Sequence, residues 1–239
     1  MRDDFYVGYE PSAPPRIRRS LRRTTTALAI LCLALATLLV LAQAPFADSR
    51  FEYGRYRDYE GDVLEWPYPM LLADAPYLLV GAGKFGVTDL LRGHDGQRAH
   101  VRGALVVRDG QRMLEIESAS LRFVSATKAT HQPAMDLGAV TLTGEIVDTK
   151  CYLGVMNPGS GKVHRDCAVR CISGGAPPAF LVRDAAGETR MLLLVGSDER
   201  QLGRRVLDFV AEPITISGRL FRHATTLVLK AEPRDFRRE

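Results

Sequence analysis

Cysteine is scarce in this sequence of 239 residues, which contains only 4, and tryptophan occurs once. So few cysteines exclude a small domain held together by a dense set of disulfides. A strong charge of either sign is also missing, because the net charge is only +4. Most of that excess is local: residues 1–23 hold six arginines and three acidic residues, so the remaining chain carries a net charge of +1. This distribution argues against a nucleic-acid-binding face.

One long apolar run stands near the N-terminus. Residues 27–44 contain no charged side chain, and with the three preceding threonines the run reaches 21 residues, enough for a helix to cross about 30 Å of hydrocarbon. Five arginines precede it: Arg16, Arg18, Arg19, Arg22 and Arg23. The positive-inside rule then places the N-terminus in the cytoplasm and residues 46–239 outside it, which predicts a bacterial inner-membrane protein with its bulk in the periplasm. A cleaved signal peptide is the alternative, since Ala42-Gln43-Ala44 resembles a cleavage site, but the run is longer than a usual signal core.

These features divide the chain into four parts. We expect a cytoplasmic tail at residues 1–23, a transmembrane helix at 24–45, a first β module at 46–130 and a second at 138–233. The tail holds three aromatic residues at positions 5, 6 and 9, which favour either docking on a partner or anchoring at the bilayer surface.

The outer region shows a weak internal repeat. Gly81 and Gly103 are 22 residues apart, and so are Gly196 and Gly218. The first halves of the two copies differ in length: Gly61 and Gly81 are 20 residues apart, whereas the matching Gly144 and Gly196 are 52 apart, a difference of 32. The sequence therefore predicts two related modules, the second with an insertion at residues 150–178.

Both modules have the pattern of β structure. Asp109-Gly110 between two apolar runs is a hairpin signal, and residues 197–209 have the pattern of a short helix. Runs rich in Val, Ile, Leu and Thr predict strands at residues 100–107, 112–117, 140–147, 213–221 and 226–231. We expect a mainly β protein with two small OB-like barrels, the second with a helical insertion; a small β-sandwich is the alternative.

The insertion contains every cysteine outside the apolar run. Residues 164–173 predict a short helix, on which His164, Cys167 and Cys171 are spaced i, i+3, i+7 and share one face. Cys151 enters from the end of a strand. The sequence thus predicts that these four side chains lie together.

Three interpretations of this cluster stay open. A disulfide of Cys151 with Cys167 or Cys171 suits an oxidising compartment but leaves one thiol over. A metal site with ligands Cys151, His164, Cys167 and Cys171 uses all four residues and suits Zn(II) or Cu(I). A reactive thiol beside His164 is the third interpretation.

The second module also carries a motif of the form Gly-Glu-Ile-Val-Asp-x-x-Cys, followed by His-x-x-Cys-Ala-x-x-x-Cys. Its positions are Gly144, Glu145, Asp148, Cys151, His164, Cys167, Ala168 and Cys171. Over residues 139–232 the chain resembles a group of poorly characterised bacterial extracytoplasmic domains. That resemblance implies an OB-like fold and a ligand or metal at the cysteines, and it supplies no established activity.

Motifs of catalysis are missing. The sequence has neither Gly-x-Ser-x-Gly nor His-Glu-x-x-His, so we expect no enzyme. The glycine-rich segment 81–86 lacks the βαβ surroundings of a dinucleotide loop. Acidic residues near strand starts, among them Glu145 and Asp148, have the pattern of solvated strand faces.

The topology predicts an accessory subunit. A single anchor, a short aromatic tail and two β modules are typical of a subunit that stabilises a larger membrane complex for respiratory or photosynthetic electron transfer, with integral membrane subunits and the bilayer as partners. The alternative is an extracytoplasmic metal-binding or metal-delivery protein.

Overall fold

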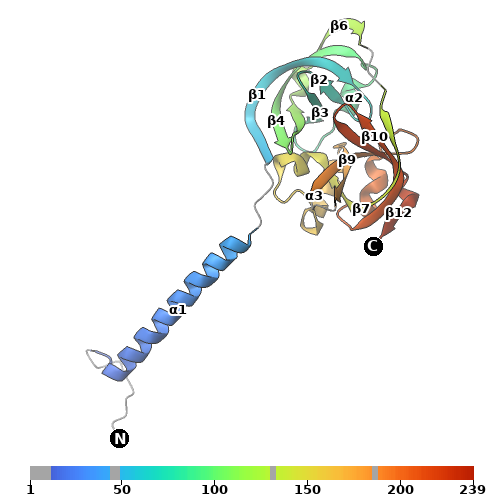
Figure 1. Cartoon of the computed structure of the whole chain (residues 1–239). Coiled ribbons are helices and arrows are strands. Elements are labelled where there is room, and N and C mark those ends of the chain that lie inside the picture. The colour runs from blue at the N-terminus through green and yellow to red at the C-terminus, as the bar shows by residue number, and fades with distance from the viewer. Residues whose placement is uncertain (1–11, 44–48, 130–132, 185–187) are drawn as a thin grey trace. The chain divides into compact units, whose positions relative to one another are not determined.

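The computed structural model describes residues 12–43, 49–129, 133–184 and 188–239 (Figure 1). The chain divides into two units, Met1–Phe46 and Ala47–Glu239, and each is described by itself. The aromatic motif of the predicted tail lies outside the described residues.

Within its described residues, 12–43, the N-terminal unit contains the helix α1 (Pro15–Ala42), of 28 residues. It begins nine residues before the span expected at 24–45, because Pro15 suits the first helical turn, where its missing N–H costs nothing, and the arginines that follow are good helix formers. Part of the predicted tail is therefore helical. By length and composition α1 can cross a membrane, and a signal sequence near the N-terminus would pass the same test.

The first module is a closed β-barrel. Strand β3 pairs with β5 in parallel, and β1 pairs with β4, which closes the sheet in the order β1-β2-β3-β5-β4. The extra strand β6 adds to the outer edge of β4. The elements are β1 (Ser49–Leu64), β2 (Met70–Leu72), β3 (Pro76–Gly81), α2 (Thr88–Leu91), β4 (Gln97–Arg108), β5 (Gln111–Ile116), η1 (Ser118–Ser120) and β6 (Arg122–Lys128).

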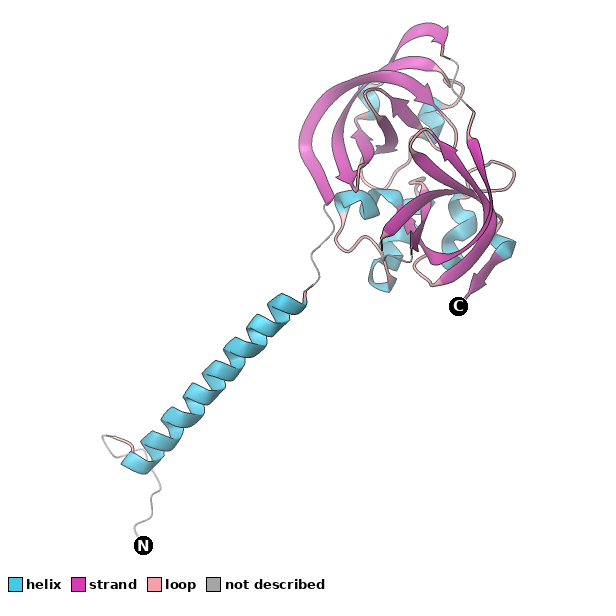
Figure 2. Cartoon of the chain, in the orientation of Figure 1, coloured by secondary structure: helices cyan, strands magenta, loops and turns pink. Residues whose placement is uncertain are grey.

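The second module repeats this topology. Its strands close in the order β7-β8-β9-β11-β10, with β9 and β11 parallel, and β12 adds to β10. The elements are β7 (Met135–Asp148), η2 (Cys151–Val155), η3 (Lys162–His164), α3 (Arg165–Ser173), β8 (Pro178–Arg183), β9 (Thr189–Val195), η4 (Gly203–Phe209), β10 (Ile214–His223), β11 (Thr226–Lys230), η5 (Pro233–Asp235) and β12 (Phe236–Arg238). Figure 2 shows that strands form the walls of both modules, while η2, η3 and α3 lie together beside them.

The predicted fold class is confirmed: the protein is mainly β, with one apolar N-terminal helix and two OB-like barrels. The glycines of the repeat occupy equivalent places, since Gly103 lies in β4 and Gly218 in β10. The predicted hairpin at Asp109-Gly110 is also confirmed. Both residues have positive φ, 49° and 76°, as a two-residue turn of type I′ requires.

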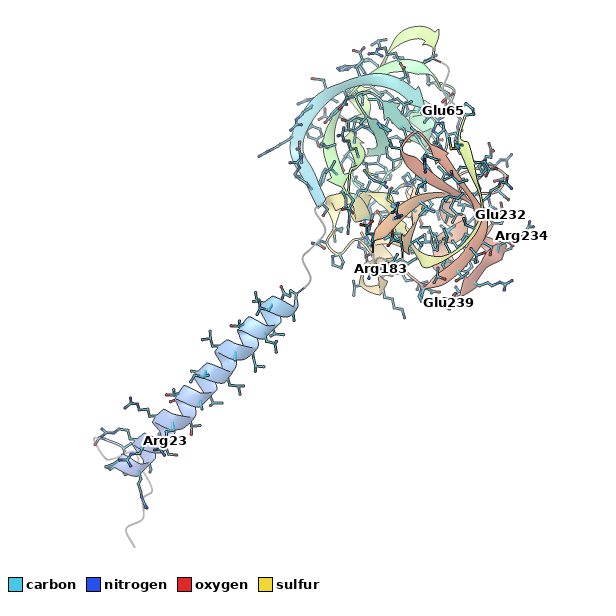
Figure 3. All side chains as sticks on the ribbon, in the orientation of Figure 1. Arg23, Glu65, Arg183, Glu232, Arg234 and Glu239 are labelled. Atoms are coloured by element: carbon cyan, nitrogen blue, oxygen red, sulfur yellow. The ribbon has the colours of Figure 1, made fainter. Side chains whose placement is uncertain are left out.

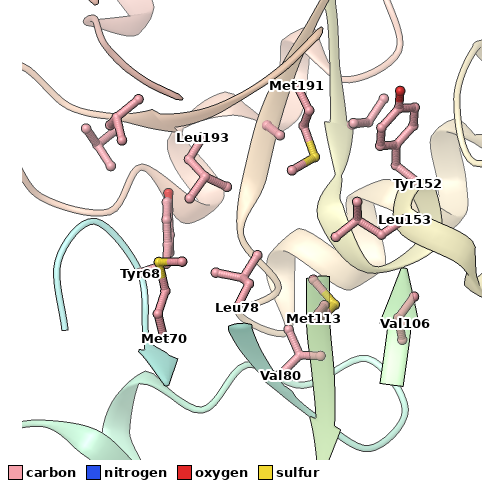
Figure 4. Packing of buried hydrophobic residues seen from close by; sticks show 14 of the residues in the cluster. Tyr68, Met70, Leu78, Val80, Val106, Met113, Tyr152, Leu153, Met191 and Leu193 are labelled. Atoms are coloured by element: carbon pink, nitrogen blue, oxygen red, sulfur yellow. The ribbon is translucent and has the colours of Figure 1, made fainter. Parts of the chain in front are cut away.

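The barrels share an apolar interface. Leu78, Val80 and Met113 of the first barrel belong to one buried cluster with Met191 and Leu193 of the second (Figure 4). Burial of such side chains stabilises by about 1.5–3 kcal/mol each, so the two barrels form one packed body. Each barrel also has its own buried apolar cluster.

Candidate functional site

The insertion between β7 and β8 carries the predicted cysteine cluster. Strand β7 ends at Asp148, and the turn η2 begins three residues later at Cys151. The predicted helix at 164–173 is present but begins at Arg165, with His164 as its N-cap and Gly174 as its C-cap. Cys151, Cys171 and His164 are buried, and Cys167 is half-buried.

The three sulfurs of the insertion lie close together. The Sγ atom of Cys151 is 3.8 Å from that of Cys167 and 3.9 Å from that of Cys171. These distances are far longer than the S–S bond of a disulfide, about 2.05 Å, and all four cysteines of the chain are free thiols. Cys32 is exposed on α1, in the N-terminal unit.

The four predicted ligands do not form a single group. The ligand atoms of Cys151, His164 and Cys167 lie within 4.8 Å of one another, and so do those of Cys151, Cys171 and Asp148. Cys151 belongs to both groups. No group among the described residues contains both His164 and Cys171, so Cys151 is the central sulfur.

Asp148 holds two members of the cluster in place. Its Oδ1 accepts a hydrogen bond from the backbone N–H of Cys151 at 2.8 Å, and its Oδ2 lies 3.1 Å from Nε2 of His164. The Asp148 side chain has no exposed surface. The expectation of a solvated carboxylate is therefore wrong for Asp148, because the insertion folds back over the end of β7.

A lysine of the first barrel reaches the same sulfurs. Lys84 follows β3 and donates hydrogen bonds from Nζ to Sγ of Cys167 at 2.9 Å and of Cys171 at 3.4 Å. An ammonium group between two sulfurs favours their thiolate form.

Glycines allow this loop of the first barrel to approach the second. A Cβ atom on Gly174 would lie 2.0 Å from the backbone oxygen of Lys84, and one on Gly86 would lie 2.1 Å from the oxygen of Gly175. The backbone N–H of Gly86 also donates to the oxygen of Gly174 at 2.9 Å. The position of Lys84 is therefore fixed by backbone contacts.

A buried ion pair fixes the start of the loop that carries Lys84. Lys150 and Glu115 are in contact through Nζ and Oε2, with only 2% and 8% of their side chains exposed. Nζ of Lys150 also donates to the backbone oxygens of Gly81 and Gly83, at 2.8 and 2.6 Å. Lys150 directly precedes Cys151, so its ion pair with Glu115 links the cysteine cluster to the first barrel.

These contacts change the acidity of the thiols. The hydrogen bond with Cys151, supported by the Lys84 ammonium, lowers the pKa of Cys171 to about 7. The same hydrogen bond and burial raise the pKa of Cys151. The hydrogen bond with Cys167 raises the pKa of Lys84, which keeps that amine charged. The cluster therefore favours the thiolate form of Cys171.

Sequence reasoning missed Lys84, Asp148 and the ion pair of Lys150 with Glu115. The signals were present: segment 81–86 is glycine-rich, and Asp148 lies three residues before Cys151. Only the fold shows that segment 81–86 packs on the insertion.

No family model, curated protein or solved structure matches this chain. The resemblance of residues 139–232 to bacterial extracytoplasmic domains accordingly stays a prediction.

Proposed function

We propose that this protein is a membrane-anchored metal-binding protein that holds one soft metal ion in the cysteine cluster. The observation that carries the proposal is the spacing of the sulfurs. A tetrahedral zinc ion with Zn–S bonds of about 2.3 Å has its sulfur ligands about 3.8 Å apart. The two distances from Cys151, 3.8 and 3.9 Å, match that edge.

In this proposal Cys151, Cys167 and Cys171 supply thiolates and His164 supplies the fourth ligand. Binding would draw Cys171 closer to Cys167 and His164, because no group of ligand atoms among the described residues contains Cys171 with either of them. Asp148 supports this role of His164: with the imidazole proton on Nε2 and donated to Asp148, Nδ1 keeps its lone pair for a metal. Metal-binding histidines commonly donate their second nitrogen to a carboxylate in this way.

Charge favours zinc over copper. Three thiolates and Asp148 bring four negative charges into a buried site, and Lys84 compensates one of them. A divalent ion leaves less uncompensated charge than Cu(I) does, and buried charge is costly unless it is paired.

A disulfide is the competing chemistry. The proximity that suits a metal would also let an oxidant join Cys151 to either neighbour. A disulfide uses two sulfurs, however, and gives no role to the third sulfur, to His164 or to Lys84. The convergence of all these groups supports metal binding.

The test is the metal content of the full-length protein purified in detergent. We expect about one zinc ion per chain, lost in Cys167→Ser and retained in Cys32→Ser, because Cys32 lies on α1. Absence of metal together with loss of two reactive thiols under denaturing conditions would establish the disulfide instead and contradict the proposal.

We further propose that the barrels lie outside the cytoplasm. Five arginines between positions 16 and 23 precede the apolar run, and such residues favour the cytoplasmic side of a membrane helix. The role of accessory subunit in a membrane electron-transfer complex stays a prediction. Purification from native membranes with identification of neighbours by mass spectrometry tests it, and a chain that always migrates alone would contradict it.

A further inference from the structure

A groove with a volume of about 630 Å³ lies along the second barrel and the insertion. It is formed by three parts of the chain: Arg108 from the end of β4, Tyr152 and Lys162 from the insertion, and Arg183 from the end of β8. None of the cluster cysteines lines it. The groove is therefore distinct from the cysteine cluster, although Tyr152 directly follows Cys151 and Lys162 lies two residues before His164.

The walls of the groove are predominantly cationic. Arg108, Lys162 and Arg183 face Glu145 as the single acidic residue of the lining. Oε2 of Glu145 already accepts the backbone N–H of Gly161 at 2.8 Å. Among the residues that the structure describes, neither Lys162 nor Arg183 forms an ion pair.

Arg108 is held in place by contacts with Tyr152. Its guanidinium carbon lies 4.1 Å from the ring centroid of Tyr152, and its Nη1 donates to the backbone oxygen of Tyr152 at 2.8 Å. Only 19% of the Arg108 side chain is exposed. Its Nε also lies 3.5 Å from Oδ2 of Asp109, so Arg108 forms a fixed side of the groove whose charge is partly compensated.

We propose that this groove binds a small organic anion, a molecule with a carboxylate or phosphate group attached to a flat apolar body. The acidic group lies between Lys162 and Arg183, and the apolar body packs against Leu181 and Pro213 of the lining. The volume is within the range of small-molecule sites, about 300–1,000 Å³. Cations drawn from both barrels and the insertion give such a ligand charge-assisted hydrogen bonds on several sides.

Calorimetric titration of the full-length protein in an uncharged detergent, with phenyl phosphate as the probe, tests the proposal. We expect saturable binding that weakens about tenfold or more in Arg183→Gln and in Lys162→Gln, the loss of one charge-assisted hydrogen bond. Arg234→Gln is the matched control, because Arg234 is an exposed arginine that Figure 3 shows well apart from Arg183. Inorganic phosphate should bind more weakly, and phenol should not bind.

Three outcomes would overturn the proposal: no saturable binding of phenyl phosphate in the millimolar range, equal weakening in Arg234→Gln, or equal binding of phenol. Metal content measured on the same variants should not change. A loss of phenyl phosphate binding with metal retained therefore separates this groove from the cysteine cluster.

Discussion

Nζ of Lys84 lies 2.9 Å from Sγ of Cys167, although the two residues come from different barrels. The cysteine cluster is therefore not a property of the second barrel alone. Its charge is balanced by a loop of the first barrel, and that loop is fixed by glycine contacts and by a buried ion pair. The predictions below test each of these links.

Replacement of Lys84 by methionine should weaken zinc binding by about 10-fold to 100-fold, the usual effect of removing a hydrogen-bond partner of a metal ligand. The thiolates would lose their cation without losing a ligand. Competition with a chromophoric chelator measures the affinity. Lys84→Arg, which keeps the charge, should retain most of the affinity, and equal affinity in Lys84→Met and the unmodified protein would refute this role.

Replacement of Asp148 by asparagine should also lower zinc affinity, by about 10-fold to 100-fold. The amide can still accept the N–H of Cys151, but it no longer attracts the imidazole proton of His164 with a full negative charge. Zinc affinity and the thermal midpoint are measured together. A fall in the thermal midpoint with unchanged affinity would show that Asp148 acts on folding alone.

Lys150→Met should destabilise the protein by about 3–5 kcal/mol, because it leaves the Glu115 carboxylate buried without its partner. The double variant Lys150→Met with Glu115→Leu should recover much of that loss, since both charges are then gone. Chemical denaturation gives the free energies of unfolding. Arg98→Met breaks the exposed pair with Glu60 and serves as the control, with an expected cost below about 1 kcal/mol.

Gly174→Ala should separate the loop of Lys84 from the insertion, because the new methyl group would collide with the Lys84 backbone oxygen. We expect a destabilisation of about 1–3 kcal/mol, as for other overpacked sites, and faster alkylation of Cys167 by a thiol reagent. Ser173→Ala, one residue earlier, adds no atom and is the control. Identical alkylation rates in the two variants would show that this contact does not control access to the sulfurs.

Much of the fold can be predicted from the sequence, since local patterns determine it. Runs with several Val and Leu residues mark β4, Ile and Thr residues mark β10, and Asp109-Gly110 marks the hairpin after β4. The long β1 is harder to recognise because none of its first twelve residues is buried, so no apolar face marks it. The strand β12 has only three residues, too few for a hydrophobic pattern.

The site is predictable only in part. The helical spacing of His164, Cys167 and Cys171 predicts that they share one face. In the structure each of the three lies close to Cys151. Lys84 cannot be found in this way, because it is 83 residues from Cys167 in sequence and its contact depends on how the barrels pack. Asp148 is the last residue of β7. Its burial cannot be predicted from the strand pattern, because it depends on the insertion that covers this end of the strand.

X-ray absorption at the zinc edge, on the full-length protein, tests the central claim most directly. The proposed site predicts three sulfur neighbours at about 2.3 Å and one nitrogen neighbour at about 2.0 Å, and it predicts that the zinc signal is lost in Cys151→Ser, as it is in Cys167→Ser. A zinc ion surrounded only by nitrogen and oxygen, or a spectrum unchanged by Cys151→Ser, would contradict it.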